Sequence, residues 1–206
     1  MFKKFFSKQA RKPSGLFGRF VTARIFEKGN AGLNRGMLDL VAASGEDRIL
    51  EIGFGTGGAI HAMAGALDGG RVEGIDFSGD MLHIAEKKNR KHIETGKVKL
   101  VHGDFDKASY PAESFDTVCT ANTIYFWPDR MLTAARIFEV LKPGGRLVIA
   151  YVEKAKMDNM PLDMEVFTPI SHVELKTLLE QAGFNSVRIY PEPDQDIAEY
   201  CAVAEK

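Results

Sequence analysis

The residues best suited to chemistry are a carboxylate and a set of glycines after a short apolar run. Glu51 lies inside the run 49–52, and the chain continues with glycines at positions 53, 55, 57 and 58. Glycines permit a tight turn and let a ligand touch the backbone, because no Cβ stands in the way. Free N–H groups at the start of a following helix favour an anionic part of that ligand. The stretch therefore predicts a nucleotide-binding turn.

Acidic residues also follow two later apolar runs. Asp76 ends the run 71–76, and Asp104 follows the run 98–102. An acid at the end of the second strand can accept hydrogen bonds from both hydroxyls of a ribose. The spacing Gly53-x-Gly55-x-x-Gly58 also satisfies a dinucleotide pattern, so NAD is one candidate ligand. Glu51 favours another, because a buried carboxylate needs a partner and a free ammonium group would supply one.

The segment Glu51-Ile-Gly-Phe-Gly-Thr-Gly57, together with the later acids, resembles the S-adenosylmethionine (SAM) site of class I methyltransferases over about residues 45–152. Leu-Lys-Pro-Gly-Gly at 141–145 is similar to the methyltransferase type 11 family, which includes quinone and sterol methylases. The resemblance implies that Glu51 binds the methionyl ammonium, Asp76 the ribose and Asp104 the adenine amine. The full set of implied cofactor contacts is Glu51, Gly53, Phe54, Gly55, Thr56, Gly57, Asp76, Phe77, Met81, Gly103, Asp104, Phe105 and Asn122.

The methyl acceptor is expected beside the end of the run 115–121, where the resembled family holds the transferred methyl group. Asn122 and Tyr125 follow this run and are the candidates for contact with the acceptor. Adenine and glutamine methylases carry Asn/Asp-Pro-Pro-Tyr there, whereas Thr-Ile separates the two residues here. His172 is the one histidine that we expect as a candidate base. The adjacent Asp-Asn pair of metal-dependent catechol-type enzymes does not occur at the end of the run 115–121, so no metal is expected.

Seven strand-like segments must position these residues. They alternate with amphipathic helical segments and predict an α/β, Rossmann-like class I methyltransferase fold: a mostly parallel sheet with helices on both faces. A short connection at 191–194 joins the last two strands and forces them to be antiparallel. The resembled family usually ends in this hairpin, and NAD-type domains do not. The strands are expected at 49–52, 71–76, 98–102, 115–121, 146–152, 185–190 and about 197–204.

The sequence divides into an N-terminal extension, residues 1–44, and a SAM-binding methyltransferase domain, residues 45–206. Residues 1–25 hold seven Lys or Arg and no acid, which leaves the rest of the chain with a net charge of -8. This basic, aromatic end predicts an interfacial helix in weak contact with anionic lipid or a lid over the substrate. The alternative is a frayed terminus followed by a helix packed on the domain.

Composition and charge limit the fold size, the compartment and the binding partners that we expect. A chain of 206 residues suits one domain and can bury a sizeable core. No apolar run approaches the ~20 residues of a membrane span. The two cysteines, Cys119 and Cys201, lie in apolar runs, which predicts reduced thiols in a cytoplasmic protein. A nucleic-acid substrate is not expected, because backbone binding needs a basic surface.

The predicted function is methyl transfer from SAM, with S-adenosylhomocysteine as product, to a small-molecule or lipid-like acceptor. The sulfonium already activates the methyl group, so a dedicated base is not required and positioning supplies much of the rate. Two other functions remain open at this point. One is an NAD-dependent oxidoreductase, and the other is a SAM-binding protein without catalysis.

Overall fold

The structure is a computed structural model that describes residues 2–13, 31–191 and 199–206. Its centre is a seven-stranded sheet in the order β3-β2-β1-β4-β5-β7-β6. Strands β1 to β5 are parallel, whereas β7 is antiparallel to both of its neighbours. The predicted fold class, with its antiparallel C-terminal hairpin, is confirmed. The strands are β1 (Arg48–Ile52), β2 (Arg71–Asp76), β3 (Val98–His102), β4 (Phe115–Ala121), β5 (Leu141–Val152), β6 (Asn185–Pro191) and β7 (Glu199–Glu205).

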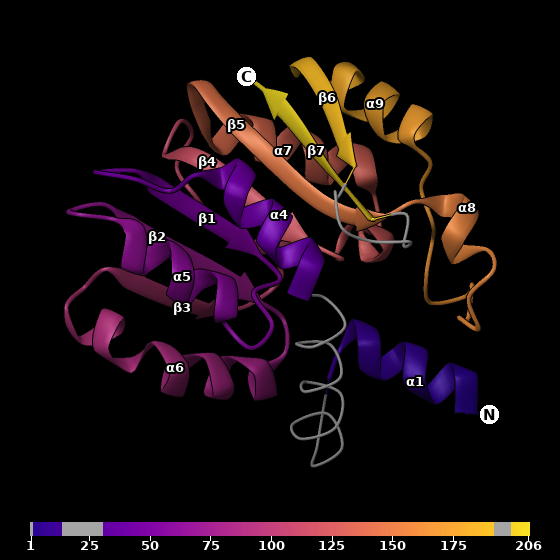
Figure 1. Ribbon diagram of the computed structural model, residues 1–206, viewed down its shortest axis with the longest axis horizontal. Helices are drawn as coiled ribbons and strands as arrows, with labels where there is room; N and C mark the ends of the chain where they lie inside the picture. The colour runs from indigo at the N-terminus through magenta and orange to yellow at the C-terminus, as the bar shows by residue number, and fades with distance from the viewer. Residues whose placement is uncertain (1, 14–30, 192–198) are drawn as a thin grey trace.

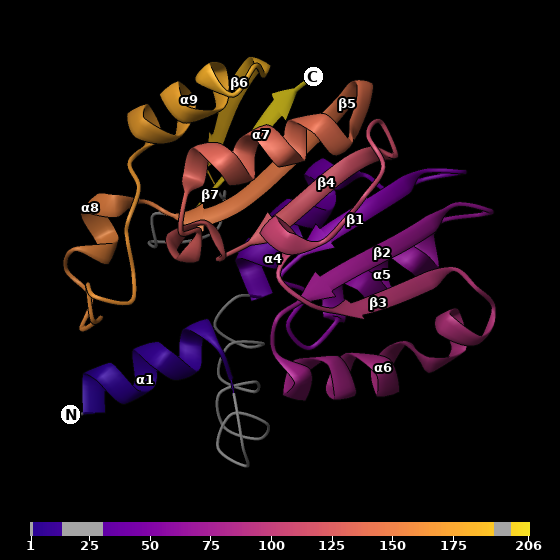
Figure 2. The same cartoon turned by 180° about the vertical axis from the view of Figure 1, so that it is seen from behind.

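Helices cover both faces of the sheet (Figure 1, Figure 2). On one face lie α4 (Ala31–Val41), α5 (Gly58–Ala66) and α6 (Gly79–Glu94), and on the other lie α7 (Arg130–Val140) and α9 (His172–Gln181). Each layer has its own apolar core, with Met37 and Ile60 fully buried in the first and Ile137 and Leu175 in the second. The central strands are buried almost continuously, as expected for parallel strands that are covered on both faces.

Side-chain caps set the starts of α6 and α9. The Ser78 hydroxyl accepts a hydrogen bond from the backbone N–H of Met81 and begins α6. Ser171 and Glu174 form a capping box at the start of α9, in which each side chain satisfies a backbone N–H of the other. Because β1, β2 and β4 are parallel, their carboxyl ends meet at one edge of the sheet, where a doubly wound fold binds its ligand.

The boundary between α7 and β5 differs from the expected one. The sequence predicts a helix to residue 141, a turn at 142–145 and a strand from 146, whereas α7 ends at Val140 and β5 already begins at Leu141. Phe115 pairs with Leu141 but Thr117 pairs with Arg146, so the proline–glycine segment is a bulge in the strand. It is retained there because Gly144 and Gly145 exchange backbone hydrogen bonds with Lys206 next to β7.

The first helix, α1 (Phe2–Arg11), lies off the carboxyl ends of the parallel strands (Figure 1, Figure 2). The Ser7 hydroxyl accepts a hydrogen bond from the backbone N–H of Asp163, and Lys4 pairs with Glu165 at 2.5 Å. The expected helical residues between 16 and 25 lie outside the described residues. No helix that the structure describes has the length and apolar character of a membrane span. Shorter helical segments are η2 (Phe105–Lys107), η3 (Ile124–Phe126) and α8 (Lys154–Met157).

Candidate functional site

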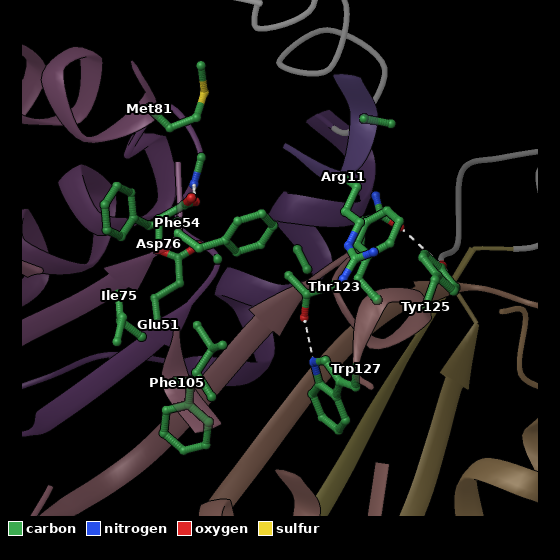
Figure 3. A pocket seen from close by; sticks show the side chains of 18 of the residues that line it. Arg11, Glu51, Phe54, Ile75, Asp76, Met81, Phe105, Thr123, Tyr125 and Trp127 are labelled. Carbon is green, nitrogen blue, oxygen red and sulfur yellow. Dashed lines mark hydrogen bonds between the residues drawn. The ribbon is translucent and has the colours of Figure 1, made fainter. Parts of the chain in front are cut away.

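A cavity of about 430 Å³ opens at the carboxyl ends of β1, β2 and β4 (Figure 3). Its walls come from the turns after these strands, from α1 and from the segment between α8 and α9. The volume lies within the range of roughly 300–1,000 Å³ that is usual for small-molecule sites. All of the predicted cofactor contacts except Gly57 line it, and so does the predicted acceptor residue Tyr125.

The turn after β1 gives the cavity a floor made of backbone. Gly53 and Gly55 have φ angles of +76° and +53°, which L side chains rarely adopt. A Cβ on Gly53 would lie 2.4 Å from the Cγ2 atom of Thr123, whereas nothing lies within 4 Å of a Cβ built on Gly55. The turn is therefore tight against the segment that follows β4 at Gly53 and open towards the cavity at Gly55.

Gly57 has a packing role that the sequence did not reveal. Its φ angle is +72°, and an added Cβ would lie 2.7 Å from both the Ala85 Cβ and the Asn89 Nδ2. The buried Asn89 side chain also donates a hydrogen bond of 3.0 Å to the Gly57 carbonyl. Gly57 therefore lets α5 approach α6 closely, behind the turn that faces the cavity.

Glu51 is a buried carboxylate with an unused acceptor. It is 3% exposed, and its Oε2 atom has no hydrogen-bond partner among the described residues. Burial and, to a lesser extent, repulsion by Asp76 raise the pKa of Glu51 to about 8. A hydrogen bond from the backbone N–H of Ile60 has the opposite, smaller effect on this pKa. A buried acceptor without a donor is costly, so this site fits a ligand that brings its own donor, such as an ammonium group.

Asp76 joins the turns after β1 and β2. Its Oδ2 accepts a hydrogen bond of 2.9 Å from the Gly55 N–H, and its Oδ1 accepts one of 2.8 Å from the Ser78 N–H. Burial raises the pKa of Asp76, and these two hydrogen bonds oppose the increase. Each carboxylate oxygen has further acceptor capacity, so the two bonds leave room for a pair of hydroxyl groups. The sequence predicted the ligand role of Asp76 but not this structural one.

The residues expected around the adenine lie together at the ends of β2 and β3. Phe77, Met81 and Gly103 line the cavity with Asp104 and Phe105. Asp104 is exposed; its Oδ1 accepts a hydrogen bond of 3.1 Å from the Asp106 N–H, and its Oδ2 lies 3.4 Å from the Lys107 Nζ. The Asp104 carboxylate is thus held at the rim by the start of η2. Phe105 is buried beneath it.

The turn after β4 carries the predicted acceptor residues. Asn122 has a φ angle of +56°, and its Oδ1 accepts a hydrogen bond of 3.2 Å from the Tyr125 hydroxyl. That hydroxyl also accepts a hydrogen bond from the Val152 N–H. Burial raises the pKa of Tyr125, so the phenol stays protonated at neutral pH and can position a ligand but not act as a base.

Several of the residues that line the cavity were missed by sequence reasoning, among them Arg11, Thr123 and Trp127. The Trp127 Nε1 donates a hydrogen bond of 3.2 Å to the Thr123 Oγ1, which fixes the indole against the wall (Figure 3). Thr123 and Trp127 follow the same strand as Asn122, and this proximity was an available signal. Arg11 had no local signal, because α1 reaches the site through contacts that are distant in sequence.

His172 does not lie at the cavity. Its Nδ1 is hydrogen-bonded to the Tyr151 hydroxyl, and its ring lies 4.2 Å from that of Tyr200. The structure therefore does not bring the expected base to the other site residues. In the described part of the chain, no histidine lines the cavity and no cluster of three metal-ligand side chains occurs.

Comparisons with known proteins agree with this geometry. Residues 49–145 match the family model described as a methyltransferase domain. An uncharacterised methyltransferase of Bacillus subtilis, YdaC, is 27% identical over 177 residues, which cover 86% of this chain and 93% of that protein. A demethylmenaquinone methyltransferase of Staphylococcus aureus is 29% identical over 192 residues, which cover 80% and 78% of the two chains.

Solved structures share the fold. A chain in the complex between the Haloferax volcanii Trm112 methyltransferase activator and a methyltransferase is 20% identical, with a TM-score of 0.77 and coverage of 97% and 96%. Phosphoethanolamine N-methyltransferase 2 of Haemonchus contortus, solved with SAM, is 18% identical with a TM-score of 0.76. That match covers all of this chain and 60% of the other.

Proposed function

We propose, from the premise that this chain belongs to the class I SAM-dependent methyltransferases, that it transfers the methyl group of SAM to a small-molecule or lipid-like acceptor. The observation that best supports SAM as the cofactor is the buried Glu51 Oε2. This atom has no hydrogen-bond partner among the described residues, and it lies beside an open glycine turn. A dinucleotide pyrophosphate would gain nothing from this carboxylate. The comparisons also do not favour an NAD-dependent oxidoreductase.

Each part of the cofactor has a matching group in the cavity. Glu51 would accept a hydrogen bond from the methionyl ammonium, and the backbone of the turn around Gly55 would hold the carboxylate. Asp76 would accept hydrogen bonds from the ribose hydroxyls, and Asp104 from the adenine amine. Phe77, Met81 and Phe105 would supply apolar contact. When bound, the sulfonium of SAM supplies an electrophilic methyl group.

The chain contributes to transfer mainly by positioning. Tyr125 and Asn122 form a hydrogen-bonded pair at the cavity wall, where they would orient the acceptor. The described lining contains no histidine, lysine or cysteine, Tyr125 stays protonated, and the four carboxylates of the lining come from β1, β2 and the segment after β3 rather than from the acceptor wall. The acceptor atom would therefore use its own lone pair, and alignment with the methyl group would supply roughly 7–11 kcal/mol of the barrier reduction.

We also propose the domain division of the sequence, with a methyltransferase domain at 45–206 and an extension at 1–44. In this division α1 covers the site and α4 completes a helical layer, since Leu33, Met37 and Val41 are fully buried against the sheet. Weak contact between residues 1–25 and a membrane surface stays a prediction. Both cysteines are buried, and buried thiols support a reducing compartment such as the cytoplasm.

The test is calorimetric titration with S-adenosylhomocysteine and, separately, with NAD. Wild-type protein should bind the first and not the second, and Glu51→Gln should weaken that binding by about 10- to 100-fold, the loss of one charge-assisted hydrogen bond. Glu46→Gln is the matched control, because this exposed glutamate lies at the amino end of β1, away from the cavity. Binding of NAD alone would contradict the proposal.

A second assay tests the reaction itself. With SAM that carries a radiolabelled methyl group, the label should move to an acceptor only when the wild-type protein is present. A protein that binds S-adenosylhomocysteine but transfers no methyl group to any acceptor would be a SAM-binding protein without catalysis.

A further inference from the structure

The charged side chains that line the cavity are unevenly distributed. In the described part of the chain they comprise four carboxylates and one cation, Arg11. The carboxylates belong to Glu51, Asp76, Asp104 and Asp106, at the β1, β2 and β3 side of the cavity. Arg11 comes from α1 and lies on the side of Thr123 and Tyr125, away from Glu51 and Asp76 (Figure 3). The cofactor half is thus acidic and the acceptor half has a positive charge.

Arg11 has no carboxylate partner among the described residues, whereas two other cations at this end of the chain each have a contact. Lys4 is paired with Glu165, and the Lys12 Nζ lies 5.8 Å from the centre of the Phe77 ring. No ion pair or side-chain hydrogen bond of Arg11 occurs within the described part of the chain. A guanidinium at the mouth of a ligand cavity can form two parallel hydrogen bonds with a carboxylate or phosphate.

Contacts on both sides of the cavity hold the helix that carries Arg11. Ser7 is fully buried, and its hydroxyl accepts the Asp163 N–H at 3.0 Å on the acceptor side. On the cofactor side, the Ser78 hydroxyl donates a hydrogen bond of 2.7 Å to the Pro13 carbonyl. These contacts hold the backbone of α1 beside the cavity, and the exposed Arg11 side chain lines the cavity from this helix.

Beside the polar side chains that follow β4, the acceptor half has an apolar wall. Phe126 and Phe167 pack with their ring centres 4.8 Å apart, and Trp127, Met157 and Leu162 also belong to this wall. Aromatic and methionine side chains favour a flexible apolar body, because they offer a large contact area and adapt to irregular shapes. One cation above such a wall is complementary to a ligand with one anionic end.

We propose that the methyl acceptor is an anionic amphiphile, whose carboxylate or phosphate pairs with Arg11 while its apolar body lies against Trp127 and Phe167. This inference rests on the proposed methyl transfer at the same site. A neutral acceptor would leave the exposed guanidinium to water and gain nothing from it, and a cationic acceptor would be repelled by it. Arg11 is the only cation in the described lining, so it directs the anionic end of the acceptor towards α1.

The test uses four ten-carbon probes below their aggregation concentrations: decanoate, decyl phosphate, decanol and decyltrimethylammonium. Each is titrated with and without saturating S-adenosylhomocysteine, and Trp127, the one tryptophan of the chain, reports binding by its fluorescence. Both anions should bind at least about tenfold more tightly than decanol, and the cation most weakly. Arg11→Gln should abolish this preference and leave the affinity for S-adenosylhomocysteine unchanged.

Lys8→Gln is the matched control, since Lys8 lies one turn earlier in α1, has the same charge and does not line this cavity. The proposal is overturned if decanoate binds no better than decanol, or if Lys8→Gln has the same effect as Arg11→Gln. It is also overturned if Arg11→Gln weakens S-adenosylhomocysteine as much as decanoate, because Arg11 would then hold the cofactor. Anion preference without any binding of S-adenosylhomocysteine would contradict only the proposed methyl transfer.

Discussion

At the scale of single residues, Glu51 couples ligand binding to pH. The pKa of this carboxyl is raised to about 8 in the protein without ligand, so most molecules hold it protonated at pH 7. An ammonium ligand favours the carboxylate form, and binding below pH 8 therefore releases a proton. The affinity for S-adenosylhomocysteine should rise between pH 6 and pH 8, by up to about tenfold per pH unit. Calorimetry across this range measures the change.

Glu51→Gln is the control for this pH dependence. Its weaker binding should vary little over the same range, because an amide does not titrate there. A wild-type affinity that falls as the pH rises from 6 to 8 would be inconsistent with an ammonium partner for Glu51.

The same residue predicts a conflict between function and stability. The folded-state pKa of Glu51 lies above its usual value of 4.5, so the folded protein binds the proton more tightly than the unfolded chain. This contribution is full below pH 4.5 and is lost as the pH rises through about 8. Glu51→Gln should therefore raise the free energy of unfolding without ligand at pH 8, by on the order of 2 kcal/mol. Urea unfolding at pH 5 and pH 8 measures it.

At pH 5 the variant and the wild type should differ much less, because both side chains are then neutral. A Glu51→Gln protein that is less stable than wild type at pH 8 would show that the carboxylate has a partner that stabilises it.

Individual site residues were predictable to the extent that their signal was local. A carboxylate within an apolar run and acids at strand ends can be read from neighbouring positions, and these residues do line one cavity. His172 differs, because a sequence places it at a helix start but not relative to Tyr151 and Tyr200, which hold it elsewhere. Arg11 depends on contacts of α1 with residues more than 150 positions away, such as Asp163.

At the scale of elements, the close approach of α5 and α6 depends on one glycine. Gly57→Ala would place a methyl group 2.7 Å from the Ala85 Cβ at a φ angle of +72°. Left-handed strain and overpacking together should cost about 2–4 kcal/mol in the free energy of unfolding. Thermal and urea unfolding measure the loss, and binding of S-adenosylhomocysteine should fall with it because the turn before α5 must shift.

Gly65→Ala is the matched control in the same helix. A Cβ at Gly65 meets nothing within 4 Å, so the variant should gain about 0.5–1 kcal/mol of stability. Equal effects of the two substitutions would show that helix–helix contact at Gly57 does not limit the packing.

The order of elements was more predictable than their boundaries. Apolar runs at strand length, separated by helical periodicity, specify a mostly parallel sheet, and the short last connection specifies the hairpin. The bulge at 142–145 was not predictable, because proline and glycines indicate a turn by local preference. Long-range backbone hydrogen bonds with Lys206 keep that segment in β5, and the residues around the segment do not predict these bonds.

At the scale of the whole molecule, α1 spans the cavity between its acceptor and cofactor sides. Removal of residues 1–13 breaks the contacts of Ser7 and Pro13 without touching the sheet. Dissociation of S-adenosylhomocysteine should become roughly tenfold faster, because closing elements limit ligand release. Stopped-flow fluorescence of Trp127 measures the rate.

The exchange Lys4→Glu with Glu165→Lys is the control, since it keeps α1 and restores the ion pair in the opposite sense. Its dissociation rate should stay close to that of the wild type. A truncated protein that releases the ligand at the wild-type rate would show that α1 does not cover the site.

The position of β7 also has a consequence for biosynthesis. It is the last of the seven strands to be translated, yet it lies between β5 and β6 and pairs with both. Until it leaves the ribosome, the nascent chain holds β5 with an open edge, and β6 has no strand to pair with. At about 5–20 residues per second, this interval lasts on the order of a second. Ribosome-associated chaperones would therefore matter most in the interval between the synthesis of β6 and that of β7.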